Sequence, residues 1–339
     1  MGWERVRGHD AVIDTFRAAF TRGRFGQAYL LLGPAGVGKR IFALELAKAL
    51  LCEKSPGPLA ACGACPACAQ AEAGTHPDLF RVRTPKDKHE LPIDEIRAFS
   101  SQMAMKPTRG SRKIGIVEDA DDFNQESANA FLKTLEEPPP GSVLLLRATN
   151  IDQQLPTILS RSQVVRFSAL PADDLRAILR EHDIDDAAKI ERLVKLAGGS
   201  AGQALALNDE EFWNLRQTLL NGITSPRPNF HSLTEAWKAY YEGAGKESRG
   251  QRLRVALVLR FLVETLQQAL RLALAAETSG LDAADAAKLR PYADRLGPER
   301  LLELIDKCIE ADYRIDRRVM TILVVESVLE QFAAPALAG

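Results

Sequence analysis

The stretch AYLLLGPAGVGKRIFALELAKALL occupies residues 28–51 and contains three successive patterns. AYLLL is a short apolar run typical of a buried strand, whereas IFALELAKALL is typical of a helix. Between them, GPAGVGKR (33–40) fits the phosphate-loop pattern G-x-x-x-x-G-K-[ST] at every position but the last. Strand, loop and helix in this order predict an α/β domain of the nucleotide-binding type.

The loop itself offers a predicted anion site with one chemical departure. Its glycines permit tight turns whose N–H groups face an anion at a helix N-terminus. Arg40 stands where a Ser or Thr hydroxyl normally ligates magnesium, and a guanidinium has no lone pair to offer. Binding of ATP with Mg²⁺ therefore stays open, hydrolysis is disfavoured, and a glycine-rich turn without a ligand is the alternative. The candidate residues are Gly33, Pro34, Ala35, Gly36, Val37, Gly38, Lys39 and Arg40.

Acidic residues follow a second predicted strand, KIGIVE (113–118). Glu118 and Asp119 come at its end, where an ATPase of this build needs one carboxylate for magnesium and another for water. The usual order is Asp before Glu, so each carboxylate is displaced by one methylene. A misplacement of about 1 Å can cost on the order of 100-fold in rate. The alternative interpretation is an ordinary solvated acidic loop.

Four cysteines lie close together in the chain with the spacing C-x9-C-x2-C-x2-C. This spacing predicts a tetrahedral Zn(II) site, and four thiolates leave no open position, so the site would be structural. Disulfides and a redox dithiol are the alternatives. The candidate ligands are Cys52, Cys62, Cys65 and Cys68; His76 is predicted to be a loop residue and Cys308 a core residue.

Strand and helix patterns alternate up to about residue 167, with further strands expected near 79–83, 142–150 and 163–167. This alternation predicts a parallel sheet covered by helices on both faces. Only helical patterns follow. The expected domains are a nucleotide-binding domain at 1–167 with a cysteine module inserted at about 52–68, a small helical domain at 168–208, and an all-helical domain at 209–335.

Composition restricts the setting of the protein. The chain has 339 residues, with 44 Lys+Arg against 45 Asp+Glu, so no overall field attracts nucleic acid. The basic stretch TRGSRK (108–113) is interpreted as a solvated loop. No apolar run approaches the ~18 residues of a membrane span, and the first residues lack a signal core. We expect a soluble cytoplasmic protein that makes no membrane contact.

The chain resembles the clamp-loader branch of the AAA+ proteins over residues 1 to about 207. The resemblance rests on QAYLLLGPAGVGKR (27–40) and on the cysteine quartet that comes after the helix following this loop. It continues in AGTHPDLFRV (73–82), in ANAFLKTLEEPP (128–139) within the segment 113–150, and in LPTILSRSQVVRF (155–167). ANAFLKTLEEPP followed by ILSRS is specific to this family.

The resemblance implies a nucleotide-binding AAA+ domain, a helical lid and an all-helical collar. It implies a hetero-pentameric ring with gamma/tau and delta subunits that opens a sliding clamp and places it on primed DNA during replication. Arg161, in SRS, would act in trans as an arginine finger on ATP held by a neighbouring subunit. Any DNA polymerase (nucleotidyltransferase) activity would belong to the whole DNA polymerase III assembly, because the chain has no polymerase-like acidic site.

Two departures from the motor subunits of this family predict a subunit that does not hydrolyse ATP. Arg40 replaces the magnesium ligand, and GSAG (199–202) has Gly202 where motor subunits carry an arginine. The first alternative is an active motor ATPase of the gamma/tau type. The second is a zinc-bearing nucleic-acid binder outside any clamp loader, which the near-neutral charge disfavours.

Overall fold

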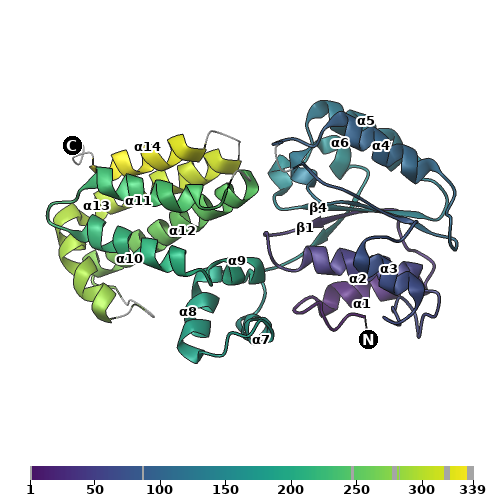
Figure 1. Ribbon diagram of the computed structural model, residues 1–339, viewed down its shortest axis with the longest axis horizontal. Coiled ribbons are helices and arrows are strands. Elements are labelled where there is room, and N and C mark those ends of the chain that lie inside the picture. The colour runs from purple at the N-terminus through teal and green to yellow at the C-terminus, as the bar shows by residue number, and fades with distance from the viewer. Residues whose placement is uncertain are drawn as a thin grey trace. The chain divides into compact units, whose positions relative to one another are not determined.

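The computed structural model of the protein describes residues 2–85, 88–245, 248–276, 281, 283–316 and 321–333. The chain divides into two compact units, Met1–Ala206 and Leu207–Gly339. In the first, a sheet lies between helical layers, and the second is built from helices (Figure 1).

The sheet of the first unit has five strands in the order β2-β3-β4-β1-β5, and every neighbouring pair is parallel. The predicted α/β class with a parallel sheet is confirmed. Because parallel strands end at one edge, the residues after β1, β3 and β4 come together there. The strands are β1 (Ala28–Leu32), β2 (Leu79–Val82), β3 (Lys113–Val117), β4 (Ser142–Ala148) and β5 (Gln163–Arg166).

Helices cover both faces of this sheet (Figure 1), and strand alternation sorts the side chains between them. Leu30 and Leu32 join the core formed with α4 and α5, whereas the Tyr29 ring lies 4.7 Å from that of Phe16 on the other face. One layer contains α1 (Asp10–Thr21), α2 (Lys39–Leu51) and α3 (Pro66–Ala73), and the other contains α4 (Ile93–Ala104), α5 (Gln125–Glu136) and α6 (Pro156–Leu159).

Three helices complete the first unit: α7 (Ala172–Glu181), α8 (Ala187–Ala197) and α9 (Ala201–Ala206). Asp186 caps α8 by accepting hydrogen bonds from the N–H groups of Ala188 and Lys189. Gly198 ends it with φ 52°, a left-handed conformation that glycine adopts without strain. The buried faces of α7 and α8 carry Leu175, Leu179, Ile190 and Leu193.

The described part of the second unit contains five helices around a core that includes the fully buried Trp237. The sequence LGP (296–298) predicts a break between two helical segments, and the backbone of Gly297 (φ 74°, ψ 165°) is indeed non-helical, so α13 consists of two helical segments joined at a kink. The expected TSG break (278–280) lies outside the described residues. The helices are α10 (Glu210–Thr224), α11 (Phe230–Glu242), α12 (Ser248–Ala273), α13 (Ala283–Asp316) and α14 (Thr321–Ala333).

A helix that spans a membrane needs about 18 or more mostly apolar residues. Within the described segments, none combines the length and the apolar character needed to cross a bilayer.

Candidate functional site

The glycine-rich loop, residues 33–38, runs from the end of β1 to the start of α2, as the sequence predicts. Gly36 (φ 77°) and Gly38 (φ 109°) adopt left-handed conformations that produce the turn. The loop therefore has the strand–loop–helix geometry of a phosphate loop.

Lys39, the first residue of α2, folds back onto this loop. Its Nζ donates hydrogen bonds to the carbonyl oxygens of Gly33 and, at 2.6 Å, Pro34. The side chain is buried, and burial lowers the pKa of Lys39 to about 8, against the opposing influence of the Asp121 carboxylate. The amine thus sits among loop carbonyls near one acidic group.

The start of α9 closes over the loop. The Ser200 hydroxyl donates to the Ala35 carbonyl at 2.8 Å, and the Gly202 N–H donates to the Gly36 carbonyl at 3.1 Å. A side chain at Gly202 would place its Cβ only 2.9 Å from the Gly36 Cα. Position 202 therefore lies in a contact with the loop that is too close for any Cβ.

The acidic residues after β3 all have partners. Glu118 pairs with Arg147 of β4, whose Nη2 lies 3.3 Å from Glu118 Oε2, and Asp119 accepts from the Thr84 N–H at 3.3 Å. Asp121 accepts from the N–H and hydroxyl of Thr149 at 2.7 and 2.9 Å, while its burial raises its pKa.

These residues do not fit a magnesium ion. Arg40 is exposed, and its guanidinium offers no lone pair to a cation. The Glu118 carboxylate is already paired with the Arg147 guanidinium, which occupies the side from which a metal ion would bind. The loop thus has the backbone shape of a phosphate loop, with Arg40 at the position of the usual hydroxyl ligand and with Glu118 paired to Arg147.

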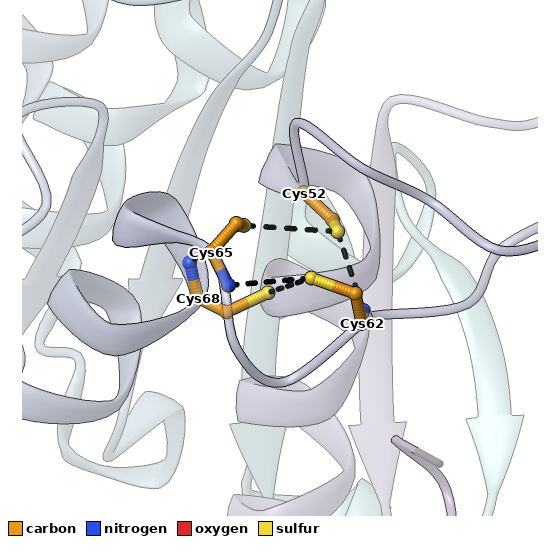
Figure 2. A group of neighbouring side chains, drawn as sticks. All are labelled: Cys52, Cys62, Cys65 and Cys68. Atoms are coloured by element: carbon orange, nitrogen blue, oxygen red, sulfur yellow. Dashed lines mark hydrogen bonds between the residues drawn. The ribbon is translucent and has the colours of Figure 1, made fainter.

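The four cysteines converge from the end of α2, the following loop and α3 (Figure 2). Their sulfur atoms all lie within 4.8 Å of one another. Cys52 Sγ lies 3.9 Å from Cys65 Sγ, and Cys62 Sγ lies 4.0 Å from Cys68 Sγ. Tetrahedral zinc with Zn–S bonds of about 2.3 Å separates its sulfurs by about 3.8 Å. The quartet therefore fits a Zn(II) ion, and all four are free thiols in this arrangement.

Backbone N–H groups prepare these sulfurs to bind a cation. The N–H groups of Cys62, Cys65 and Cys68 point at the sulfurs of Cys52, Cys62 and Cys65, at 3.3, 3.3 and 3.4 Å. Such donors stabilise thiolates. For Cys65, burial acts in the opposite direction, and the donors prevail and lower its pKa to about 6.

Charged side chains fasten the cysteine module to α2. Lys48 of α2 donates to Glu45 at 3.0 Å and to Glu72 of α3 at 2.8 Å, and Arg5 contacts both carboxylates. Glu45 and Lys48 are buried, whereas Glu72 is half exposed. The module is thus tied to the helix that begins at the glycine-rich loop.

The basic stretch 108–113 is held in the structure, so the interpretation as a solvated loop is wrong for Lys113. Its buried Nζ donates to the carbonyls of Gln102 and Met105 at the end of α4. Asp78, fully buried, accepts from the N–H groups of Thr108 and Arg109 at 2.6 Å each.

His76, which precedes β2, is a loop residue and lies outside the sulfur cluster, as predicted. Its Nδ1 accepts from the Asp78 N–H at 3.0 Å, so the ring supports the backbone of this turn. Cys308 is fully buried in α13, which confirms the prediction of a core residue.

Arg161 lies just after the short helix α6, on the surface. Its Nε donates to Glu136 Oε1 at 2.7 Å, and its Nη1 donates to the Thr157 carbonyl at 3.1 Å. The guanidinium side chain keeps 33% of its surface exposed. The Arg161 guanidinium is therefore held at the surface by an ion pair with Glu136 and by the end of α6.

Two residues of the loop region escaped sequence reasoning. The sequence places Arg147 only within a predicted buried strand and Ser200 only within the motif GSAG (199–202). A charged residue inside the apolar run SVLLLRA (142–148) was the available signal for Arg147. Ser200 acts on a residue 165 positions away, which no local pattern reveals.

The sheet order, the glycine-rich loop after β1 and the acids after β3 define a P-loop protein of the AAA+ type. Residues 8–171 match the family described as DNA polymerase III, delta subunit. The chain belongs to the family of DNA polymerase III clamp-loader subunits, and within it to the delta-prime group.

Three relatives illustrate this membership. The chain is 30% identical to DNA polymerase III subunit delta' of Pseudomonas aeruginosa over 321 residues, covering 92% of this chain and 93% of that protein. It is 31% identical to the Escherichia coli subunit delta' over 223 residues, 65% and 66% of the two chains. It is 33% identical to subunit tau of Salmonella typhimurium over 211 residues, 60% of this chain and 32% of tau.

Proposed function

We propose that this chain is a non-hydrolysing subunit of a clamp loader. It joins gamma/tau-type and delta-type subunits in a hetero-pentameric ring that loads a sliding clamp onto primed DNA. Arg161 completes the ATP site of a neighbouring subunit in trans. The proposal depends on a contrast between two sites. Lys39 and Ser200 donate hydrogen bonds to the carbonyls of the glycine-rich loop, whereas Arg161 lies at the surface.

The remaining parts follow from this role. Residues 33–40, Glu118 and Asp119 are the remnant of a nucleotide site. Cys52, Cys62, Cys65 and Cys68 hold a structural Zn(II) ion. Residues 1–167, 168–208 and 209–335 form the nucleotide-type domain, the lid and a collar that assembles the ring. Replication in the cytoplasm is the setting in which such a subunit works.

The decisive experiment is ATP turnover by the reconstituted ring with Arg161→Ala. We expect a loss of about 10³-fold or more with ring assembly intact, because an arginine finger stabilises charge in the transition state. Arg166→Ala, an exposed arginine on β5, is the matched control and leaves turnover unchanged. Normal turnover in an assembled Arg161→Ala ring contradicts the trans role.

A second candidate function is an active motor ATPase of the gamma/tau type. It is favoured by the identity to tau over 60% of this chain and by the presence of Lys39. Magnesium-dependent hydrolysis by the purified chain, compared with Lys39→Ala, separates the two. We expect no turnover above that control, and turnover abolished by Lys39→Ala identifies a motor.

A further inference from the structure

An arginine occupies an unusual position in the sheet next to the glycine-rich loop. Arg147 belongs to β4, in which the other six residues are buried. It is paired in register with Leu31 of β1, two residues before the loop begins. On the other side, the pairing of Val117 with Leu146 brings Glu118 beside Arg147 at the same edge of the sheet.

The two charged groups form a tight, mostly buried pair. Arg147 Nη2 donates to the Glu118 carbonyl oxygen at 2.9 Å and lies 3.3 Å from Glu118 Oε2. The side chains are only 12% and 14% exposed. A carboxylate with so little water around it requires a compensating cation, and here the neighbouring strand supplies it.

The positive charge of Arg147 also extends to the loop. The charge of Arg147 lowers the pKa of Lys39, whereas the charge of Asp121 raises it. The edge that bears the loop therefore already contains Lys39 and Arg147, next to the exposed Arg40. A hydrated divalent cation entering this edge would meet these charges and would have to displace Arg147 to reach Glu118.

We propose that Arg147 is a built-in counterion that takes the place of a divalent cation at this loop. Its guanidinium neutralises Glu118 permanently, so the edge does not recruit Mg²⁺. This inference deepens the proposed function and rests on it in treating the loop as a former ATP-hydrolysing site. Arg147 thus opposes a metal site at this edge in addition to the missing hydroxyl at position 40.

The test measures Mn²⁺ binding to the full-length, zinc-loaded chain by electron paramagnetic resonance. The wild-type chain should show no Mn²⁺ binding that depends on Glu118. Arg147→Met, which keeps the length and removes the charge, should gain one Mn²⁺ site at least about tenfold tighter than any wild-type binding. Arg147→Met/Glu118→Gln should lose that site, and Arg166→Met should behave as wild type.

Two results overturn the proposal: Mn²⁺ binding by the wild-type chain that Glu118→Gln abolishes, or a folded Arg147→Met chain that gains no Mn²⁺. Circular dichroism and thermal unfolding establish whether each variant is folded. If Arg147→Met does not fold, Arg147→Gln provides the charge-free variant, and a folded Arg147→Gln chain that gains no Mn²⁺ overturns the proposal equally. Ring turnover with Arg161→Ala is a separate measurement, so the failure of either proposal is recognised independently.

Discussion

Helix α2 carries two candidate sites, one at each end, that differ in what holds their geometry. At its N-terminus, the glycine-rich loop has the backbone shape of a phosphate loop, Ser200 donates a hydrogen bond to its Ala35 carbonyl, and Arg147 pairs with Glu118 beside it. At its C-terminus, Cys52 opens a quartet whose sulfur geometry suits a zinc ion. The comparison teaches that a loop can keep its backbone shape while the side chains around it change. A four-cysteine site, in contrast, depends on all four side chains for its geometry.

The largest effect is expected at the cysteine end. Cys65→Ser should abolish binding of zinc and lower the free energy of unfolding by several kcal/mol, because metal binding and folding of such modules are coupled. Metal analysis and denaturant unfolding measure both. Cys308→Ser, at a buried cysteine of the second unit, should keep about one zinc per chain. Retention of zinc by Cys65→Ser would contradict the four-thiolate site.

At the loop end, the charge of Lys39 should make stability depend on pH. Its pKa falls from 10.5 to about 8 on folding, so between these values the unfolded chain binds more protons. Stability should therefore rise with pH across this window, by up to about 3 kcal/mol relative to Lys39→Met. Denaturant unfolding at pH 7 to 10 measures the difference, and parallel curves for the two chains would refute the lowered pKa.

A smaller effect is expected where α9 touches the loop. Gly36→Ala would place a Cβ 2.3 Å from Ser200 Oγ and 2.9 Å from Gly202 Cα, so we expect a loss of about 1–3 kcal/mol. Gly23→Ala is matched in backbone conformation (φ 65°) with nothing within 4 Å, and isolates the strain of φ alone. Equal losses for the two variants would show that the lid contact contributes nothing.

The smallest effect concerns the ion pairs between α2 and the cysteine module. Glu72→Gln should cost less than about 1 kcal/mol, because this carboxylate is half exposed. The hydrogen bond from Lys48, ahead of other causes, lowers the pKa of Glu72 below 4.5. Its contribution is therefore present above pH 4.5 and disappears as the pH falls through the lowered value. Thermal unfolding at pH 7 and pH 3 should show a smaller deficit of the variant at pH 3 than at pH 7.

Local patterns accounted for most of the first unit. The apolar run 28–32 is β1 at those bounds, and the expected strand at 142–150 is β4, Ser142–Ala148. Such runs succeed because a strand buried on both faces has few polar residues. Helix α3, in contrast, is not predicted from the sequence, because its N-cap is the Cys65 sulfur, which accepts from the Cys68 N–H.

The chemistry at the loop was less predictable than the loop itself. The sequence identified Arg40 as a departure, but it gave no indication that Arg147 would face Glu118, 29 residues away. That contact depends on the register of two parallel strands, which only the folded sheet determines. The cysteine quartet was predictable as a set because its ligands are local.

The contact between Gly36 and Gly202 has a consequence for how such a chain evolves. Any Cβ at either position meets the backbone of the other at 2.9 Å, so a substitution at either glycine must move α9 away from the loop. Selection for this close contact would therefore preserve the loop glycine whether or not a nucleotide binds. A glycine of a nucleotide-binding motif can thus be retained because two distant segments of the chain pack against each other at that position.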